Sequence, residues 1–71
     1  MQITVKARFN SSSERFEKYG QNRYLFYLPF EQDGDAQEVL ISLLSRYMGV
    51  PPARIAFRGF DQNKDWVFEV N

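Results

Sequence analysis

The sequence predicts an α+β fold: a two-layer sandwich in which one helix covers one face of a four-stranded, mainly antiparallel sheet. Three observations support this class. One stretch has helical periodicity with start and stop signals at its ends. Shorter stretches rich in apolar and aromatic residues lie on both sides of it. The 71 residues suffice for one small core, so a single domain over residues 1–71 is expected.

Residues 2–9 form the first predicted strand. One phase of this stretch is polar or basic, and the other phase is apolar and consists of Ile3, Val5, Ala7 and Phe9. Strict alternation is typical of a strand with one buried and one solvated face.

Residues 10–22 are mostly polar and end in a Gly-Gln-Asn turn signal. They predict a long loop between the first two strands. Two aromatic residues interrupt this polar segment, and we expect Phe16 and Tyr19 to hold the loop against the edge of the core.

The second predicted strand, residues 23–30, is apolar on both phases. Such a strand usually lies inside a sheet, with one phase against the helix and the other covered by side chains or a partner. Pro29 ends it, because proline has no amide hydrogen to donate.

The predicted helix follows an acidic turn. Asp35 is expected to cap the first turn, with Glu38 reaching back to the cap amide. Gly49 and Pro51 supply the stop. The apolar face, widened by Ile41 and Met48, consists of Ala36, Val39, Leu40, Leu43, Leu44 and Tyr47.

After the helix, residues 54–59 predict a short strand, residues 59–65 a turn and residues 66–70 the last strand, with Trp66, Phe68 and Val70 inward. The element order is therefore ββαββ. A ubiquitin-like β-grasp has the same order, but its sheet is mixed and its first and last strands are parallel. Periodicity does not separate these two folds.

Composition excludes several kinds of chemistry. There is no cysteine and no histidine, which removes thiol nucleophiles, Cys/His metal sites and the usual general base. No apolar run approaches the ~20 residues of a membrane span. We expect a cytoplasmic protein that is not an enzyme, needs no cofactor and is a monomer or weak homodimer.

Acidic residues cluster before and within the first helical turn, at Glu31, Asp33, Asp35 and Glu38. Carboxylates attract Mg²⁺ or Ca²⁺, but the sequence past Asp35 runs into helix formers rather than a ligand-bearing loop. The same acids would repel a phosphate from the helix start. We therefore expect no metal here.

The leading functional hypothesis is a binding or adaptor module for a protein partner. Phe60 lies in a polar turn, where an apolar side chain either folds back or meets a partner. The expected partner-binding residues are Phe60, Trp66, Tyr27 and Met48.

The alternative is an RNA-binding module. Basic strand residues interleaved with aromatic ones can hold a single strand by phosphate attraction and base stacking. The residues expected to do so are Lys6, Arg8, Arg23, Arg58 and Tyr24.

Motifs over nearly the whole chain resemble the YggU-like family of small proteins, whose function is not established. They are Pro29, Asp33-Gly34-Asp35-Ala36, Leu40-Ile41, Leu43-Leu44, Gly49-Val50-Pro51, Arg54-Ile55 and Gly59. The resemblance implies the two-layer ββαββ sandwich. The chain departs from the family at the helix start, where Gly-Lys-Ala-Asn is usual, and in the turn after Gly59, where Lys64 alone matches the basic residues of Ser-Arg-x-Lys.

Overall fold

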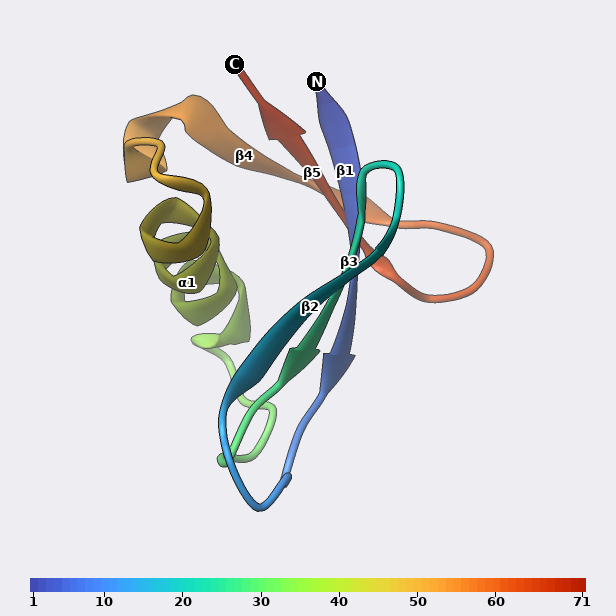
Figure 1. Ribbon diagram of the computed structural model, residues 1–71, viewed down its shortest axis with the longest axis vertical. Coiled ribbons are helices and arrows are strands. Elements are labelled where there is room, and N and C mark those ends of the chain that lie inside the picture. Colours follow the sequence, from blue (N-terminus) through green and yellow to red (C-terminus); the bar gives the residue numbers. More distant parts are fainter.

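The computed structural model describes residues 1–71 and shows one helix packed against one face of a five-stranded sheet (Figure 1). The helix α1 spans Ala36–Met48, and a 3-10 turn at Pro52–Arg54 follows it. The strands are β1 (Gln2–Arg8), β2 (Arg15–Gly20), β3 (Arg23–Tyr27), β4 (Ile55–Phe60) and β5 (Trp66–Val70). The predicted α+β class is confirmed. No helix has both the length and the apolar character that a membrane crossing requires.

The sheet is mixed, and its strand order is β2-β3-β1-β5-β4. The central strand β1 pairs parallel with β3 and antiparallel with β5. The pairs β2–β3 and β4–β5 are antiparallel hairpins. The prediction of four strands was therefore wrong by one, and one strand pair is parallel. The β-grasp alternative is wrong as well, because the first and last strands run antiparallel.

β2 is the strand that the sequence did not predict, and it lies inside the expected loop 10–22. The order is therefore βββαββ rather than ββαββ. Phe16 is its one half-buried large side chain, and it stacks on Tyr24 and Tyr47 with ring centroids 5.2 Å and 4.8 Å away. An edge strand can be mostly polar. One inward residue gave no periodic signal.

β3 is inserted between β1 and the strand that follows β1 in sequence (Figure 1). A two-residue turn joins β2 to β3, and Asn22 adopts a positive φ of 58° there. Beyond the ends of β1 and β3 the two segments remain in contact. The amide of Leu28 donates to the Arg8 carbonyl at 2.8 Å, and that of Asn10 donates to the Phe30 carbonyl at 2.9 Å.

The two ends of α1 differ in how well the sequence predicted them. Asp35 makes no side-chain cap, so the expected capping by Asp35 and Glu38 is wrong. Instead, Asp33 Oδ1 accepts a hydrogen bond from the Asp35 amide at 2.9 Å and shapes the turn before the helix. The stop at Gly49 is confirmed, with a φ of 72° and an amide that donates to the Ser45 carbonyl at 2.9 Å.

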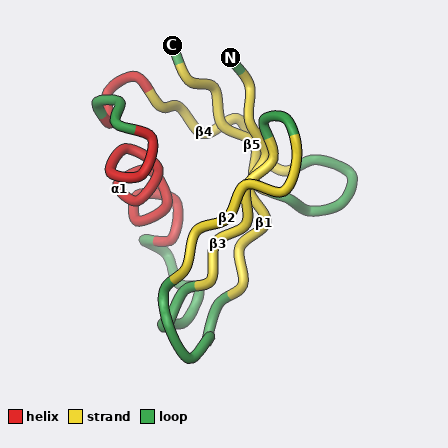
Figure 2. The backbone as a smooth tube through the Cα atoms, viewed as in Figure 1, coloured by secondary structure: helices red, strands yellow, loops and turns green.

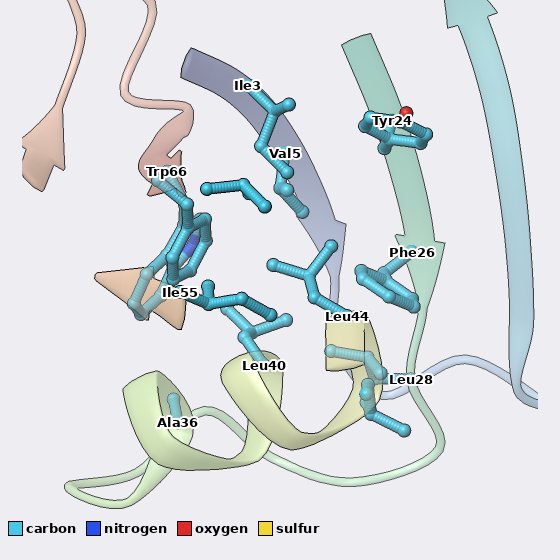
Figure 3. Packing of buried hydrophobic residues seen from close by; sticks show 13 residues of the cluster. Ile3, Val5, Tyr24, Phe26, Leu28, Ala36, Leu40, Leu44, Ile55 and Trp66 are labelled. Carbon is cyan, nitrogen blue, oxygen red and sulfur yellow. The ribbon is translucent and has the colours of Figure 1, made fainter. Parts of the chain in front are cut away.

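The core lies between α1 and the sheet (Figure 3). Leu40 and Leu44 point from the helix toward Phe26 and other strand side chains, and all three are fully buried. Of the predicted helical face, Tyr47 differs most, because it is 43% exposed and covers Phe16 at the core margin. The whole cluster consists of Ile3, Val5, Tyr24, Phe26, Leu28, Ala36, Leu40, Leu43, Leu44, Ile55, Trp66, Phe68 and Val70.

The face of the sheet away from α1 is partly apolar. Leu25 and Tyr27 of β3 are half-buried there, and Val67 of β5 is only 8% exposed. The prediction that both phases of β3 would be covered is confirmed for the phase against α1, whereas the outer phase is only half-buried.

Candidate functional site

A β-bulge in β4 brings Phe60 to the same side of the sheet as Trp66. Phe57 lies opposite Phe68, but Gly59 rather than Arg58 lies opposite Val67. The extra residue shifts the alternation by one, so Phe60 pairs with Trp66 on the helix-facing side. Gly59 has a φ of 111°, which favours glycine strongly. Without the bulge, Phe60 would point to the outer face.

Phe60 forms an aromatic cluster with its new neighbours. Its ring centroid is 4.7 Å from that of Trp66 and 5.4 Å from that of Phe57, both in edge-to-face geometry. Trp66 is 8% exposed and belongs to the core, whereas Phe60 is 54% exposed. The cluster therefore extends the hydrophobic core out to the surface.

The loop between β4 and β5 is closed by the side chain and backbone of Asp61. Its Oδ1 accepts hydrogen bonds from the amides of Asn63 and Asp65 at 2.9 Å and 3.0 Å. Its carbonyl accepts from the amide of Lys64, also at 3.0 Å. These bonds fix a compact loop beside Phe60, and the loop projects from the sheet on the side away from α1 in Figure 2.

A cleft of about 410 Å³ lies between this loop and the end of β1. Its main lining residues are the apolar Phe9, Phe60 and Trp66 and the charged Lys6, Lys64 and Asp65. A site of this size and composition fits a few residues of peptide or a small molecule. Apolar and charged side chains thus line the same concave surface.

Of the charged side chains in the cleft, two form an ion pair and one has no partner. Lys6 Nζ lies 3.3 Å from Asp65 Oδ1, and the Asp65 residue is only 8% exposed. Lys64 makes no ion pair. Two lysines and one aspartate leave the cleft with a net charge of +1. An anionic group on a ligand would therefore find an unpaired cation at the rim.

The structure brings together two of the four expected partner-binding residues. Phe60 and Trp66 meet in the cleft. Tyr27 lies on the outer face of β3, and Met48 is the last residue of α1, half-buried against the core. Neither of these two lines the cleft.

The expected RNA-binding residues lie on both faces of the sheet. Lys6 and Arg8 share the outer face of β1, and Arg23 lies on β3 opposite Thr4. Arg58 is on β4, separated from β1 by the whole of β5. Tyr24 faces α1, is 8% exposed and stacks on Phe16, so it does not share a surface with the basic residues.

Tyr27 is the aromatic residue that does lie among basic side chains. It is opposite Arg8 on one side and Arg15 on the other. The Arg15 guanidinium carbon is 4.7 Å from the Tyr27 ring centroid, and Arg15 also pairs with Glu17 at 2.9 Å. Because Arg15 already covers the ring, a base would have to displace it. Sequence reasoning missed Arg15 because β2 was expected to be loop.

The acidic residues around the start of α1 do not assemble into a site. No group of three or more His, Cys, Asp or Glu side chains is placed to hold a metal ion. The Asp33 carboxylate is already bonded to the Asp35 amide.

Comparisons with models of protein families, with curated proteins and with solved structures found no match to this chain. Two features of the site were not predicted: the bulge, which Gly59 inside a strand signals, and the unpaired Lys64, which was considered only as the one basic residue that matches the turn of the YggU-like family.

Proposed function

We propose that the protein is a small non-enzymatic binding module that acts through a protein partner, and that the partner occupies the cleft at Phe60. The observation that carries this proposal is that Phe60 is 54% exposed although it is joined to the core through Trp66. Exposed aromatic residues on a rigid base are typical anchors of protein interfaces. The bulge at Gly59 inserts an extra residue into β4 and thereby places Phe60 beside Trp66, which supports a role for the position of this side chain.

We also propose that the chain is a divergent YggU-like protein that works in the cytoplasm. The Gly-Val-Pro stop after the helix and the glycine in the following strand support the resemblance. Gly49 has a φ of 72° and Gly59 a φ of 111°, so both positions need glycine for a backbone reason. The basic residues usual in this family at the helix start and in the turn are mostly missing here, which favours apolar contact over anion binding.

A photo-crosslinking residue in place of Phe60, with Tyr19 as the matched control position, tests the proposal. Tyr19 is similarly exposed, at 46%, but lies on β2 and does not line the cleft. In native lysate we expect one protein to be crosslinked from position 60 and not from position 19. Capture should survive ribonuclease treatment and moderate salt.

Phe60→Ala should weaken capture by about tenfold or more, whereas Tyr19→Ala should not change it. Phe60 is half-exposed, so its loss should leave the far-ultraviolet circular dichroism spectrum unchanged. Equal capture from both positions, or capture unaffected by Phe60→Ala, would contradict the proposal.

The alternative function, RNA binding, is favoured by one observation. Arg8 and Arg15 flank Tyr27 on the outer face of the sheet, next to a small polar pocket of about 180 Å³ formed by Ser11–Ser13. If this surface binds RNA, affinity for single-stranded oligonucleotides should fall steeply with salt, because phosphate contacts release counterions. Arg8→Ala combined with Arg15→Ala should abolish it, while Phe60→Ala should not.

A further inference from the structure

One edge of β1 is left without a neighbouring strand inside the cleft. β1 pairs with β3 from Thr4 to Arg8 but with β5 only from Gln2 to Val5. The edge from Lys6 to Arg8 that faces β5 is therefore open. At about 3.3 Å per residue it is about 10 Å long, enough for a short extended segment.

The main chain of Ala7 points to this open edge. The amide of Thr4 donates to the Asn22 carbonyl and the carbonyl of Arg8 accepts from Leu28, so these residues face β3. Met1 bonds to Val70 on the opposite side, through both its amino group and its carbonyl. Bonding direction alternates along a strand, so Ala7 faces the same side as Met1 and directs its N–H and C=O into the cleft.

The loop after β4 explains why β5 does not fill this edge. Extending the β1–β5 register past Val5 and Trp66 places Lys64 opposite Ala7. The Lys64 amide is already bonded to the Asp61 carbonyl, and its φ of 64° is incompatible with a strand. The N–H and C=O of Ala7 thus have no strand partner, as at any open edge of a sheet to which a further strand can be added.

The two sides of the open edge differ in chemistry. On the helix-facing side, a segment next to Ala7 would meet the aromatic rings of Phe60 and Trp66. On the other side it would meet Lys6, which pairs with Asp65, and the unpaired Lys64 also lines the cleft. A strand directs alternate side chains to these two sides, so the matching sequence alternates apolar and acidic residues.

We propose that the cleft binds an extended acidic segment of the partner, which adds a short strand to β1 through hydrogen bonds with the main chain of Ala7. Strand addition of this kind obtains affinity from backbone bonds and specificity from alternate side chains. The inference rests on the proposed function, since it names the chemistry of the partner at the same cleft. The net charge of +1 and the free Lys64 select the acidic segment.

The probe is a short blocked peptide of alternating Glu and Leu, compared with the same pattern of Lys and Leu. Amide hydrogen exchange measured by NMR is the readout. In the free protein Ala7 should exchange faster than Lys6 and Arg8, whose amides face β3. Saturating acidic peptide should slow exchange at Ala7 by about tenfold or more, and the basic peptide should bind more weakly.

A methylated peptide and a protein variant distinguish backbone contacts from side-chain contacts. Methylating one central amide of the peptide removes a hydrogen bond without touching the protein, and should weaken binding about tenfold. Lys64→Gln should weaken binding of the acidic peptide, whereas Lys18→Gln, on the distant edge strand β2, should not.

Shifts at the Trp66 indole without protection of Ala7 would overturn strand addition while leaving the proposed function in place. If neither peptide binds, strand addition is overturned as well, and crosslinking from position 60 would then test the proposed function separately. If the protein self-associates and the peptide competes with this self-association, a second copy of this chain occupies the cleft instead of a partner segment. That outcome would also overturn the proposal.

Discussion

Tyr47 Oη donates a 2.7 Å hydrogen bond to Glu14 Oε2, which ties the last turn of α1 to the residue before β2. The same carboxylate oxygen accepts from Arg46 at 2.8 Å. The Tyr47 ring meanwhile stacks on Phe16 of β2, nearly parallel to it. Glu14, Phe16 and Tyr47 thus fasten the edge strand that the sequence did not predict.

This contact predicts a change of stability in alkaline solution. The hydrogen bond to Glu14 is the main cause that raises the pKa of Tyr47 above its ordinary value of 10.0. The neutral phenol is therefore favoured in the folded state. The stability that the neutral phenol adds to the folded state is complete below pH 10.0 and is lost as pH rises through the raised pKa. The free energies of unfolding in urea of the protein and of the Tyr47→Phe variant should therefore converge as the solution becomes more alkaline.

Glu14→Gln provides the control for this prediction, because it removes the charge and weakens the acceptor but keeps the shape. The phenolate absorbance change that Tyr47→Phe abolishes should move to lower pH in Glu14→Gln. If it moves to higher pH, Glu14 is not the cause of the raised pKa.

A second pH dependence is expected at the chain terminus. The ammonium group of Met1 lies 2.7 Å from Glu69 Oε2 and lowers the pKa of that carboxyl below 4.5, mainly by its hydrogen bond. A lowered folded pKa adds stability above pH 4.5, and this stability is lost as pH falls through the folded value. NMR titration of the Glu69 side chain should show the lowered pKa. Acetylation of the terminus should raise it again.

The helix stop gives a matched pair of glycine substitutions. Gly49→Ala should destabilise the fold by about 1 kcal/mol, because a side chain is strained at a φ of 72°. Gly34 has no positive φ and nothing within 4 Å of an added Cβ. Gly34→Ala should therefore change stability by ~0.5 kcal/mol or less. Equal losses in chemical denaturation would contradict the assignment of Gly49 as the helix cap.

The core prediction concerns Leu40, which is fully buried between the helix and the sheet. Leu40→Ala should cost about 2–5 kcal/mol, because it removes apolar contact and leaves a cavity. Ser42 is exposed on the same helix, and Ser42→Ala should be neutral or slightly stabilising. Thermal unfolding followed by circular dichroism compares the two. A Leu40→Ala variant as stable as Ser42→Ala would show that the helix does not pack as described.

The sequence predicted the elements whose signals are local. The helix, its stop at Gly49 and the strands around Ile3 and Phe68 are each encoded by apolar periodicity or a turn residue within a few positions. β2 was not predictable this way, because its place depends on Phe16 meeting Tyr47, which lies far away in sequence. The direction of β1 relative to β3 was equally hidden, since a parallel and an antiparallel partner show the same alternation.

In the candidate site, too, the features with local signals were predictable and those that depend on distant segments were not. Phe60 and Trp66 were found because an apolar side chain in a polar turn is visible in the sequence. Their meeting required the bulge at Gly59, and the free edge at Ala7 required the register of three strands. Tyr24 was assigned to a solvated surface although its phase matches Phe26, and the fold places both against the helix.

The position of β1 also bears on how the chain assembles. The hairpins β2–β3 and β4–β5 each close a short loop and can form early and independently, whereas no strand pair other than those of β1 joins them. β1 precedes both hairpins in the sequence but must wait for partners at both of its edges, one of which is β5, more than 50 residues away. The rate of folding should therefore depend on β1 docking between two finished halves. Val5→Ala should slow folding, and so should a destabilising substitution in either hairpin turn, because both hairpins are already formed when β1 docks.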